Sequence, residues 1–505
     1  MMRPLKKGMP GAWPALALVF GMAAVVAAIG PAESAEVRIT PRLEVRETYT
    51  DNVNLTPTDS LVPGDIRQDD FVTTVSPGLS AQITGTRVQL RASYTANYLV
   101  FANLGMDDLR HSLQSSATIE PIENYLSIDT QASISQQFLD REGGFSGSDA
   151  NLTGNRGTIR SFSSSPRFAV RFGQIAETTV RYRFSYITTN DERMLEGLAD
   201  TLTDAVRHSA SVNITSGPAF GRLRWSLNGE IDRENREDST GTDVPNFGGD
   251  TVSLGLQYAL DRTFSLRGSV SYRDTDNVSL TDPGNNLAWD AGLNVNPNRR
   301  LSMNFTVGKN QGNTTFGGSL DYQWTNKTRV SINYTDRIQT SQGALASNLP
   351  QIGPGDDGGL VDEDGFPFDP TRPNLGFDSR ISRDKDLRAG ASYTSGRMSF
   401  NAGAFVLRRE FDRAGGESLR YGGNVGITRT FSRNTTGSAS FSIDNDQFEG
   451  SARGDITTVT QASINRTIGE LLAGRLTFIR SDRNSNEVGA DIKEIAVTVA
   501  LEARF

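Results

Sequence analysis

Arginine supplies nearly all of the positive charge in this sequence and is its most chemically capable residue type. Almost all of the 51 basic residues are arginine, and many stand on the polar side of segments in which polar and apolar residues alternate. A guanidinium carries a planar fork of donors that binds carboxylates, phosphates and sugar hydroxyls through paired hydrogen bonds. Arginines lining a wet passage would therefore guide an anionic solute or polymer. The candidates for such a lining are Arg42, Arg46, Arg91, Arg181, Arg183, Arg222, Arg224, Arg267 and Arg329.

A second interpretation of these arginines is structural. Opposite charges on neighbouring strands pair across a sheet, and ion-pair ladders stabilise wet barrel interiors. The two interpretations are compatible, because one part of a wall can be paired while another part faces solute.

The longest connection between alternating segments, residues 336 to 384, is rich in glycine and carboxylates. It supplies the candidates for a constriction of the passage: Asp356, Asp357, Asp362, Glu363 and Asp364. A connection of this length can fold inward, narrow a pore and oppose its carboxylates to the arginines. Two alternatives are a calcium site, although the EF-hand spacing is absent, and a solvated surface loop.

Enzyme chemistry finds little support in the sequence. The chain has two histidines, His111 and His208, and both fall in the apolar phase of their segments. It has no cysteine, which excludes thiol catalysis, thiolate metal sites and disulfides. A phosphate-binding glycine loop, a dinucleotide fingerprint and a nucleophile elbow are all absent. We expect no catalytic residue, no metal and no cofactor.

The last stretch of the chain shows which element positions the arginines. From Glu494 to Phe505, the odd-numbered residues are apolar and most even-numbered ones are polar or small. A period of two with one apolar face predicts a β-strand with lipid on one side and a wet lumen on the other. A tilted strand crosses a bilayer in about 9 to 11 residues, which this stretch satisfies.

The same pattern repeats along the whole chain from Val37. Short polar turns separate the segments and alternate with longer connections, as in bacterial barrels with brief periplasmic turns. The sequence therefore predicts an all-β fold, a transmembrane antiparallel up-and-down β-barrel of about 22 strands (range 18 to 24), with both chain ends in the periplasm. The predicted turns lie at 84–87, 121–124, 173–176, 261–263, 296–300, 325–327, 395–397 and 432–434.

The N-terminal region reads as an export signal. Arg3, Lys6 and Lys7 precede an apolar core and small residues at Ala32 and Ala35, so residues 1–35 are expected to be a signal peptide cleaved near either alanine. Residues 36–505 then form a single barrel domain. The alternation begins almost at the cleavage site, so no plug domain of the siderophore-transporter kind is expected. Cleavage changes the formal charge from -8 to 48 minus 58, or -10, which argues against nucleic-acid binding.

A seven-residue segment occurs twice. Thr50–Thr56 and Thr275–Thr281 match at six positions and lie 225 residues apart. Asp and Asn cap turns by bonding their own backbone, so the preferred interpretation is strand-end turn chemistry or a trace of duplication. A paired binding site at the two strand ends is the alternative.

A resemblance to a known family is carried by the first mature residues. The segments Pro41–Leu55, Asp70–Leu79 and Gly85–Tyr98 resemble the outer-membrane β-barrel family associated with PEP-CTERM/exosortase systems, related to putative porins encoded with exopolysaccharide genes. The resemblance implies an outer-membrane barrel of a Gram-negative bacterium that serves export of exopolysaccharide or sorted surface proteins, with polysaccharide or export-system proteins as partners. The terminal Phe505 resembles the end of bacterial outer-membrane barrels, where it is read as an assembly signal by the barrel assembly machinery. The resemblance to the family implies no catalytic or binding residue.

Two functions from different classes follow. The first is a porin-like channel in the outer-membrane lipid, because a barrel of this size is wider than its side chains can fill. The second is a non-conducting structural or adhesive surface protein whose loops bind polymer or partner proteins. Inward folding of the 336–384 connection and a continuous wet lumen would favour the channel. Outward loops over a lumen closed by arginine–carboxylate ladders would favour the surface protein.

Overall fold

The computed structural model describes most of the chain after residue 34. It covers residues 35–60, 66–138, 142–190, 203–238, 243–275, 286–310, 312–340, 343, 353–354, 360–361, 381–411, 416–448 and 452–505. The predicted signal peptide therefore lies outside the described residues and stays a prediction. No helix in the described part of the chain is long and apolar enough to span a membrane.

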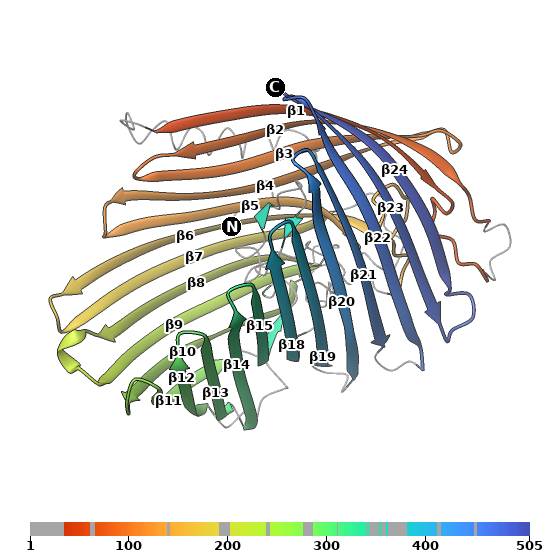
Figure 1. Cartoon of the computed structure of the whole chain (residues 1–505). Coiled ribbons are helices and arrows are strands. Elements are labelled where there is room, and N and C mark those ends of the chain that lie inside the picture. The colour runs from red at the N-terminus through yellow and green to blue at the C-terminus, as the bar shows by residue number, and fades with distance from the viewer. Residues whose placement is uncertain are drawn as a thin grey trace, which may run out of the picture.

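Twenty-two strands form one antiparallel sheet that closes on itself through β1 and β24. In Figure 1 the strands follow one another around the barrel in chain order until β24 lies beside β1. The strands are β1 (Glu36–Thr50), β2 (Asp70–Thr84), β3 (Val88–Phe101), β4 (Met106–Ile122), β5 (Leu126–Phe138), β6 (Arg156–Phe172), β7 (Ala176–Asn190), β8 (Thr203–Ser216), β9 (Leu223–Asp238), β10 (Asp243–Ala259), β11 (Phe264–Thr275), β12 (Leu287–Asn298), β13 (Leu301–Asn310), β14 (Asn313–Thr325), β15 (Thr328–Thr340), β18 (Ile381–Ser395), β19 (Met398–Phe411), β20 (Glu417–Ser432), β21 (Thr435–Gln447), β22 (Gly454–Ile468), β23 (Leu472–Ser485) and β24 (Ile492–Arg504).

Two short strands and one 3-10 turn of the described residues lie outside the barrel sheet. The strands β16 (Gly353–Pro354) and β17 (Leu360–Val361) pair with each other between β15 and β18. A 3-10 turn, η2 (Pro218–Phe220), joins β8 to β9.

The alternation of each strand is the reason that the sheet has two different faces. In β24, Ile495, Val499 and Leu501 are exposed on the outer face, whereas Glu494 and Glu502 are buried on the inner face. The same period of two holds in the other strands, because successive side chains of a strand point to opposite sides. The outer face is therefore an apolar belt and the inner face a polar lumen. This arrangement is that of a barrel in the bacterial outer membrane, which confirms the predicted fold class and location.

Exposed aromatic residues mark one edge of the belt. Phe172, Trp324, Phe431 and Phe505 all stand at the ends of descending strands, on the outer wall near the short turns. Aromatic girdles of this kind sit at the interface of lipid and water. The short-turn end of the barrel is the periplasmic end by the same comparison.

The predicted turns coincide with the observed periplasmic turns to within three residues. Glycine or asparagine takes a positive φ in three of them, at Asn124 (64°), Gly173 (58°) and Gly396 (59°). Two further periplasmic turns, 217–222 and 469–471, were not in the predicted set.

The prediction of long connections at the other end was wrong for some hairpins. β3 and β4 are joined by Ala102–Gly105 alone, and residues 311–312 alone join β13 to β14. Gly105 and Gly312 adopt φ values of 63° and 86°, which permit these tight turns.

Candidate functional site

The lumen wall is the surface on which a solute would act, and the structure places eight of the nine candidate arginines on strands, in the inward phase. They lie on β1, β3, β7, β9, β11 and β15. Arg222 differs, because it belongs to the exposed periplasmic turn before β9, where its Nη1 donates to the Leu260 carbonyl at 3.4 Å. The other eight are Arg42, Arg46, Arg91, Arg181, Arg183, Arg224, Arg267 and Arg329.

Inward arginines near the extracellular end of β18–β24 are ion-paired across strands. Arg409 Nε and Nη2 donate to the two carboxylate oxygens of Asp384 at 3.0 and 3.2 Å. Arg420 lies 3.4 Å from Asp444 and 3.5 Å from Asp446. All five side chains are buried. In this part of the wall the arginines have the structural role, pairing with carboxylates across strands.

The same pairing continues to the next strands. Arg453 Nη2 donates to Asp455 Oδ2 at 2.8 Å, and Arg483 Nε lies 3.9 Å from the same oxygen. Asp455 is 2% exposed, so both guanidinium groups are held by one fully buried carboxylate. Charges arranged in this way neutralise one another and leave little field for a passing solute.

Four inward arginines nearer the periplasmic end of β7, β9 and β11 behave differently, whereas Arg236 and Arg273, farther along β9 and β11, have partners. Within the described residues, Arg181, Arg183, Arg224 and Arg267 make no hydrogen bond and no ion pair. The Nε atom of Arg267 is buried without a hydrogen-bond partner there. These four residues are named the free arginine row below. Apart from the buried Nε of Arg267, no described residue engages their donors, which are open to hydrogen bonds with solute.

The strand register brings two members of the row close together. Arg224 is opposite Gln257 on β10, and Gln257 is opposite Arg267 on β11. Neighbouring strands are about 4.8 Å apart, so the two arginine backbones lie about 10 Å apart on the same face. Gly292, opposite Arg267, leaves room for the guanidinium, because a Cβ there would lie 2.6 Å from Nε. The two arginines and Gln257 line a hollow of about 860 Å³.

A different loop from the predicted one folds into the barrel. Residues 142–155, between β5 and β6, are named the inner loop. Its Ser146 hydroxyl donates to Glu494 Oε2, and its Gly147 backbone donates to Ser481 Oγ at 2.9 Å. Glu494 and Ser481 are inward residues of β24 and β23, on the far side of the seam from β5. The loop therefore reaches from β5 across the inside of the wall to β23.

Two arginines fix the middle of the inner loop. Arg46 Nη1 lies 3.1 Å from Asp149 Oδ2, and Arg110 donates to the Asp149 carbonyl and, at 2.8 Å, to the Asn151 carbonyl. Desolvation acts to raise the pKa of Asp149, but Arg46, Arg156 and Arg110 outweigh it and lower that pKa to about 2. One of the predicted lumen arginines, Arg46, is thus a tether for the loop.

Apolar packing anchors the inner loop at the extracellular mouth. Val53, Val72, Leu99, Phe101 and Ala150 form a buried cluster. Leu104 and Leu152 pack against this cluster, and the Leu152 backbone donates to the Val53 carbonyl at 2.8 Å. The tethers of the loop lie on β1–β6 and β22–β24, whereas the free arginine row lies on β7, β9 and β11.

The predicted constriction residues lie outside the described residues. These are Asp356, Asp357, Asp362, Glu363 and Asp364. At the start of their loop, Thr340 Oγ1 donates to Glu234 Oε1 at 2.7 Å and accepts a hydrogen bond from the Gly343 backbone at 2.9 Å. Because β15 and β9 are six strands apart, the chain leaving β15 reaches over to β9.

The repeated segment supplies turn chemistry in its first copy. Asn52 Nδ2 donates to the Thr56 and Lys493 carbonyls at 2.9 and 3.0 Å, and Asn52 Oδ1 accepts from the Thr56 backbone at 2.9 Å. Asn52 is fully buried. These bonds agree with the structural interpretation, and all but the first residue of the second copy lies outside the described residues.

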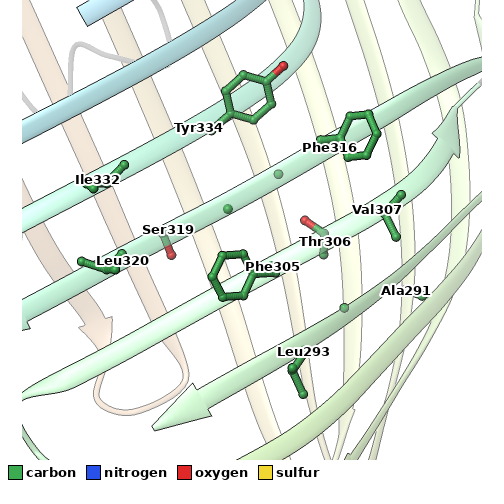
Figure 2. A pocket seen from close by; sticks show the side chains of 13 residues that line it. Ala291, Leu293, Phe305, Thr306, Val307, Phe316, Ser319, Leu320, Ile332 and Tyr334 are labelled. Carbon is green, nitrogen blue, oxygen red and sulfur yellow. The ribbon is translucent and has the colours of Figure 1, made fainter. Parts of the chain in front are cut away.

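The remaining features of the wall are the two histidines, the question of metal ligands and an apolar hollow. His111 and His208 lie in the outward phase, where Tyr94 and Tyr182 contact their Nδ1 atoms at 2.7 Å. The described residues contain no group of three or more acidic, histidine or cysteine side chains suited to a metal. An apolar hollow of about 740 Å³ on β12–β15 is lined by outward residues such as Phe305, Phe316 and Ile332 (Figure 2), so it belongs to the lipid-facing wall.

The comparisons with known proteins assign this chain to no family. No family model and no curated protein matches the chain. Solved structures that resemble it include the siderophore receptor PirA from Pseudomonas aeruginosa, with 12% identity, a TM-score of 0.40 and coverage of 93% of this chain and 80% of that one. The siderophore receptor PirA from Acinetobacter baumannii has 10% identity and a TM-score of 0.49, with coverage of 92% of this chain and 80% of that one. The outer membrane channel DcaP of A. baumannii has 11% identity and a TM-score of 0.31, with coverage of 94% of this chain and 98% of that one. Because these identities and TM-scores are low, the function is inferred from the structure of the barrel itself.

Proposed function

We propose that the protein is a porin-like channel of the outer membrane that passes anionic, hydroxyl-rich solutes. The observation that carries the proposal is the free arginine row on β7, β9 and β11. Four guanidinium groups with no hydrogen-bond or ion-pair partner among the described residues face a polar lumen, whereas Arg409, Arg420, Arg453 and Arg483 are neutralised by carboxylates. Unpaired charge in a confined passage concentrates counter-ions and selects the sign of the permeant ion.

The size of the barrel supports conduction. A barrel of 22 strands is wider than its own side chains can fill, so water or inserted chain must occupy the interior. The inner loop supplies inserted chain near β1–β6 and β22–β24. The finer proposal, that the solute is an exopolysaccharide or sorted surface component on its way out, rests on the sequence resemblance and on the affinity of arginine for sugar hydroxyls and carboxylates.

The second candidate function is a non-conducting surface protein, and the inner loop is the observation that favours it. The loop is tethered at Ser146, Gly147 and Asp149, and a rigid insert is what a closed lumen requires. Conduction measurements separate the two functions.

The test is single-channel recording of the refolded mature protein in a planar bilayer, with anion and cation permeabilities measured from the reversal potential. We expect stable currents with a preference for anions. Substitution of the free arginine row by glutamine (R181Q, R183Q, R224Q and R267Q together) should move the reversal potential toward cation preference. The matched control is R433Q, which removes one charge from a periplasmic turn outside the row. A folded barrel that stays electrically silent would refute the channel and leave the surface protein.

A further inference from the structure

Three periplasmic turns on one side of the barrel bring positive charge to one place. Arg262 lies in the turn between β10 and β11, Arg299 and Arg300 in the turn between β12 and β13, and Lys327 in the turn between β14 and β15. Together with Arg329 at the start of β15, they line a hollow of about 1020 Å³, named the basic vestibule below.

The charge of the vestibule is almost unopposed. Asp321 is the single carboxylate in its described lining, and Arg329 Nη2 occupies it at 2.7 Å. Lys327 Nζ donates to Ser395 Oγ at 3.0 Å, a neutral partner. The side chains of Arg262, Arg299 and Arg300 make no hydrogen bond or ion pair with described residues.

The nearest acidic residue in these turns is used by the backbone. Asp261 Oδ1 accepts hydrogen bonds from the Thr263 and Phe264 backbones at 2.6 and 2.8 Å, which lowers the pKa of Asp261. Its carboxylate is therefore committed to shaping the turn that presents Arg262.

Hydrogen bonds between the turns hold the vestibule together. The Asn296 backbone donates to the Thr263 carbonyl at 2.7 Å, and the Gln323 backbone donates to the Arg300 carbonyl at 2.7 Å. Within the second turn, the Arg300 backbone donates to Asn298 Oδ1 at 2.8 Å. The charged side chains thus project from a connected rim, and a ligand would not have to order the backbone.

The uncharged part of the lining combines polar residues with Pro297, Leu301 and Tyr322, and its inward-facing part opens to the lumen. Asn298, Gln323 and Asn326 supply amides, and Gln323 and Ser392 lie in the inward phase of their strands. Amides and hydroxyls bind sugar hydroxyl groups, whereas the guanidinium groups bind carboxylates. A hollow of this volume accommodates several sugar rings.

We propose that the basic vestibule is a binding site for an acidic oligosaccharide, a sugar chain that bears carboxylates, at the periplasmic mouth of the barrel. The meaning of this site for transport rests on the proposed channel function, but the binding itself does not. The site would give a chain arriving from the periplasm its first contact with the lumen, below the free arginine row.

The experiment is a binding titration of the mature barrel in detergent micelles with a fluorescent oligogalacturonate, read by anisotropy. The probes for comparison are a neutral malto-oligosaccharide of equal length and tripolyphosphate. The variant is R262Q, R299Q and R300Q together, all in exposed turns. Loss of three exposed charge contacts should raise the Kd for oligogalacturonate about tenfold. The control variant, R397Q with R433Q, removes charge from two other periplasmic turns and should leave the Kd unchanged.

Three results would overturn the proposal. The first is a Kd for oligogalacturonate that does not change in the triple variant, and the second is equal binding of the neutral oligosaccharide. The third is equal binding of tripolyphosphate, which would show that the site recognises negative charge and not a sugar. Bilayer recording on the same preparations keeps the two ideas separate. Binding without current would support the proposed binding site and reject the channel function. Current without binding would support the channel function and reject the binding site.

Discussion

At the scale of single residues, the same side chain serves two purposes according to what the strand register places beside it. Arg409 is opposite Asp384 on β18 and is paired and buried. Arg224 and Arg267 are both opposite Gln257, which cannot neutralise them. Whether an inward arginine is structural or available to solute is therefore decided by the residue across the ladder.

Glu494 is the residue on which the inner loop depends most. Its carboxylate accepts hydrogen bonds from Thr50 Oγ1 at 2.7 Å and from Ser146 Oγ, and the side chain is 1% exposed. The substitution E494A leaves both hydroxyls without this acceptor, which should lower the free energy of unfolding by about 1–3 kcal/mol. It should also make the inner loop susceptible to protease.

The matched control for that substitution is E502A. Glu502 is on the same strand and the same face, but it accepts from Arg504 at 2.6 Å near the periplasmic end. Denaturant unfolding and limited proteolysis measure the two variants. Equal protease resistance of the inner loop in E494A and the wild type would contradict the tether.

The contacts of Asp149 predict that the inner loop depends on pH. Its pKa is about 2 in the folded protein, because Arg46, Arg156 and Arg110 outweigh desolvation, and the ordinary value is 3.8. A lowered pKa contributes stability that is complete above pH 3.8 and is lost as the pH falls through about 2. Pepsin should therefore cleave the inner loop of the wild type near pH 2 and spare it near pH 4.

The variant D149N should remove that dependence. Asparagine carries no charge, so cleavage by pepsin should no longer increase between pH 4 and pH 2 beyond the change in pepsin activity, which an unfolded substrate calibrates. A wild-type loop that is cut equally at both pH values would show that the Arg46–Asp149 contact does not hold it.

At the scale of elements, the strands follow from local pattern and the loops do not. The alternation from Glu494 to Phe505 fixes which side chains meet lipid, and the polar turns fix where each strand reverses. Both signals lie within a dozen residues. The fold, the strand number and the faces of the arginines therefore follow from the sequence.

The inward folding of the inner loop could not be predicted from the local sequence pattern. Its segment is rich in glycine, serine and asparagine, which indicates a loop of any kind, and its partner Glu494 lies 348 residues later. The acidic connection at 336–384 is distinguished in the sequence by its length and charge, but neither property determines whether it folds inward. Inward folding depends on contacts between distant strands, and no local pattern encodes those contacts.

Deletion of each loop tests which one limits the current. Replacement of residues 143–154 by a short glycine-serine linker removes the tethers at Ser146, Gly147 and Asp149, but keeps β5 and β6 in register through their own ladder. We expect a larger single-channel conductance than in the wild type. The comparison is deletion of residues 345–380. If the second deletion alone raises the conductance, the inner loop is not the constriction.

At the scale of the whole molecule, closure of the sheet is the property that every other feature needs. β1 pairs with β24 over nine residues, from Arg42 opposite Arg504 to Thr50 opposite Ala496. A closed barrel has no free strand edge, and all of its backbone groups on the membrane path can pair. The seam also places Glu494 beside Thr50, so closure creates the site that holds the inner loop.

Phe505 stands at the end of that seam and offers a test of how the barrel is assembled. Its backbone donates to the Pro41 carbonyl at 3.0 Å, while its side chain is 69% exposed on the outer wall. The substitution F505A keeps the backbone bond, so spontaneous refolding in detergent should change by no more than about 1 kcal/mol. We propose that the assembly machinery reads Phe505, so in cells we expect a much larger loss of folded barrel.

The control is V499A, which truncates another exposed apolar side chain of β24, in the middle of the strand. Heat-modifiable gel mobility measures the folded fraction for purified protein and for isolated membranes alike. A loss confined to membranes and to F505A would assign Phe505 to recognition. Parallel losses in both variants and both settings would instead mean that Phe505 contributes only lipid-facing apolar surface, and that recognition of the barrel depends on features other than its last residue.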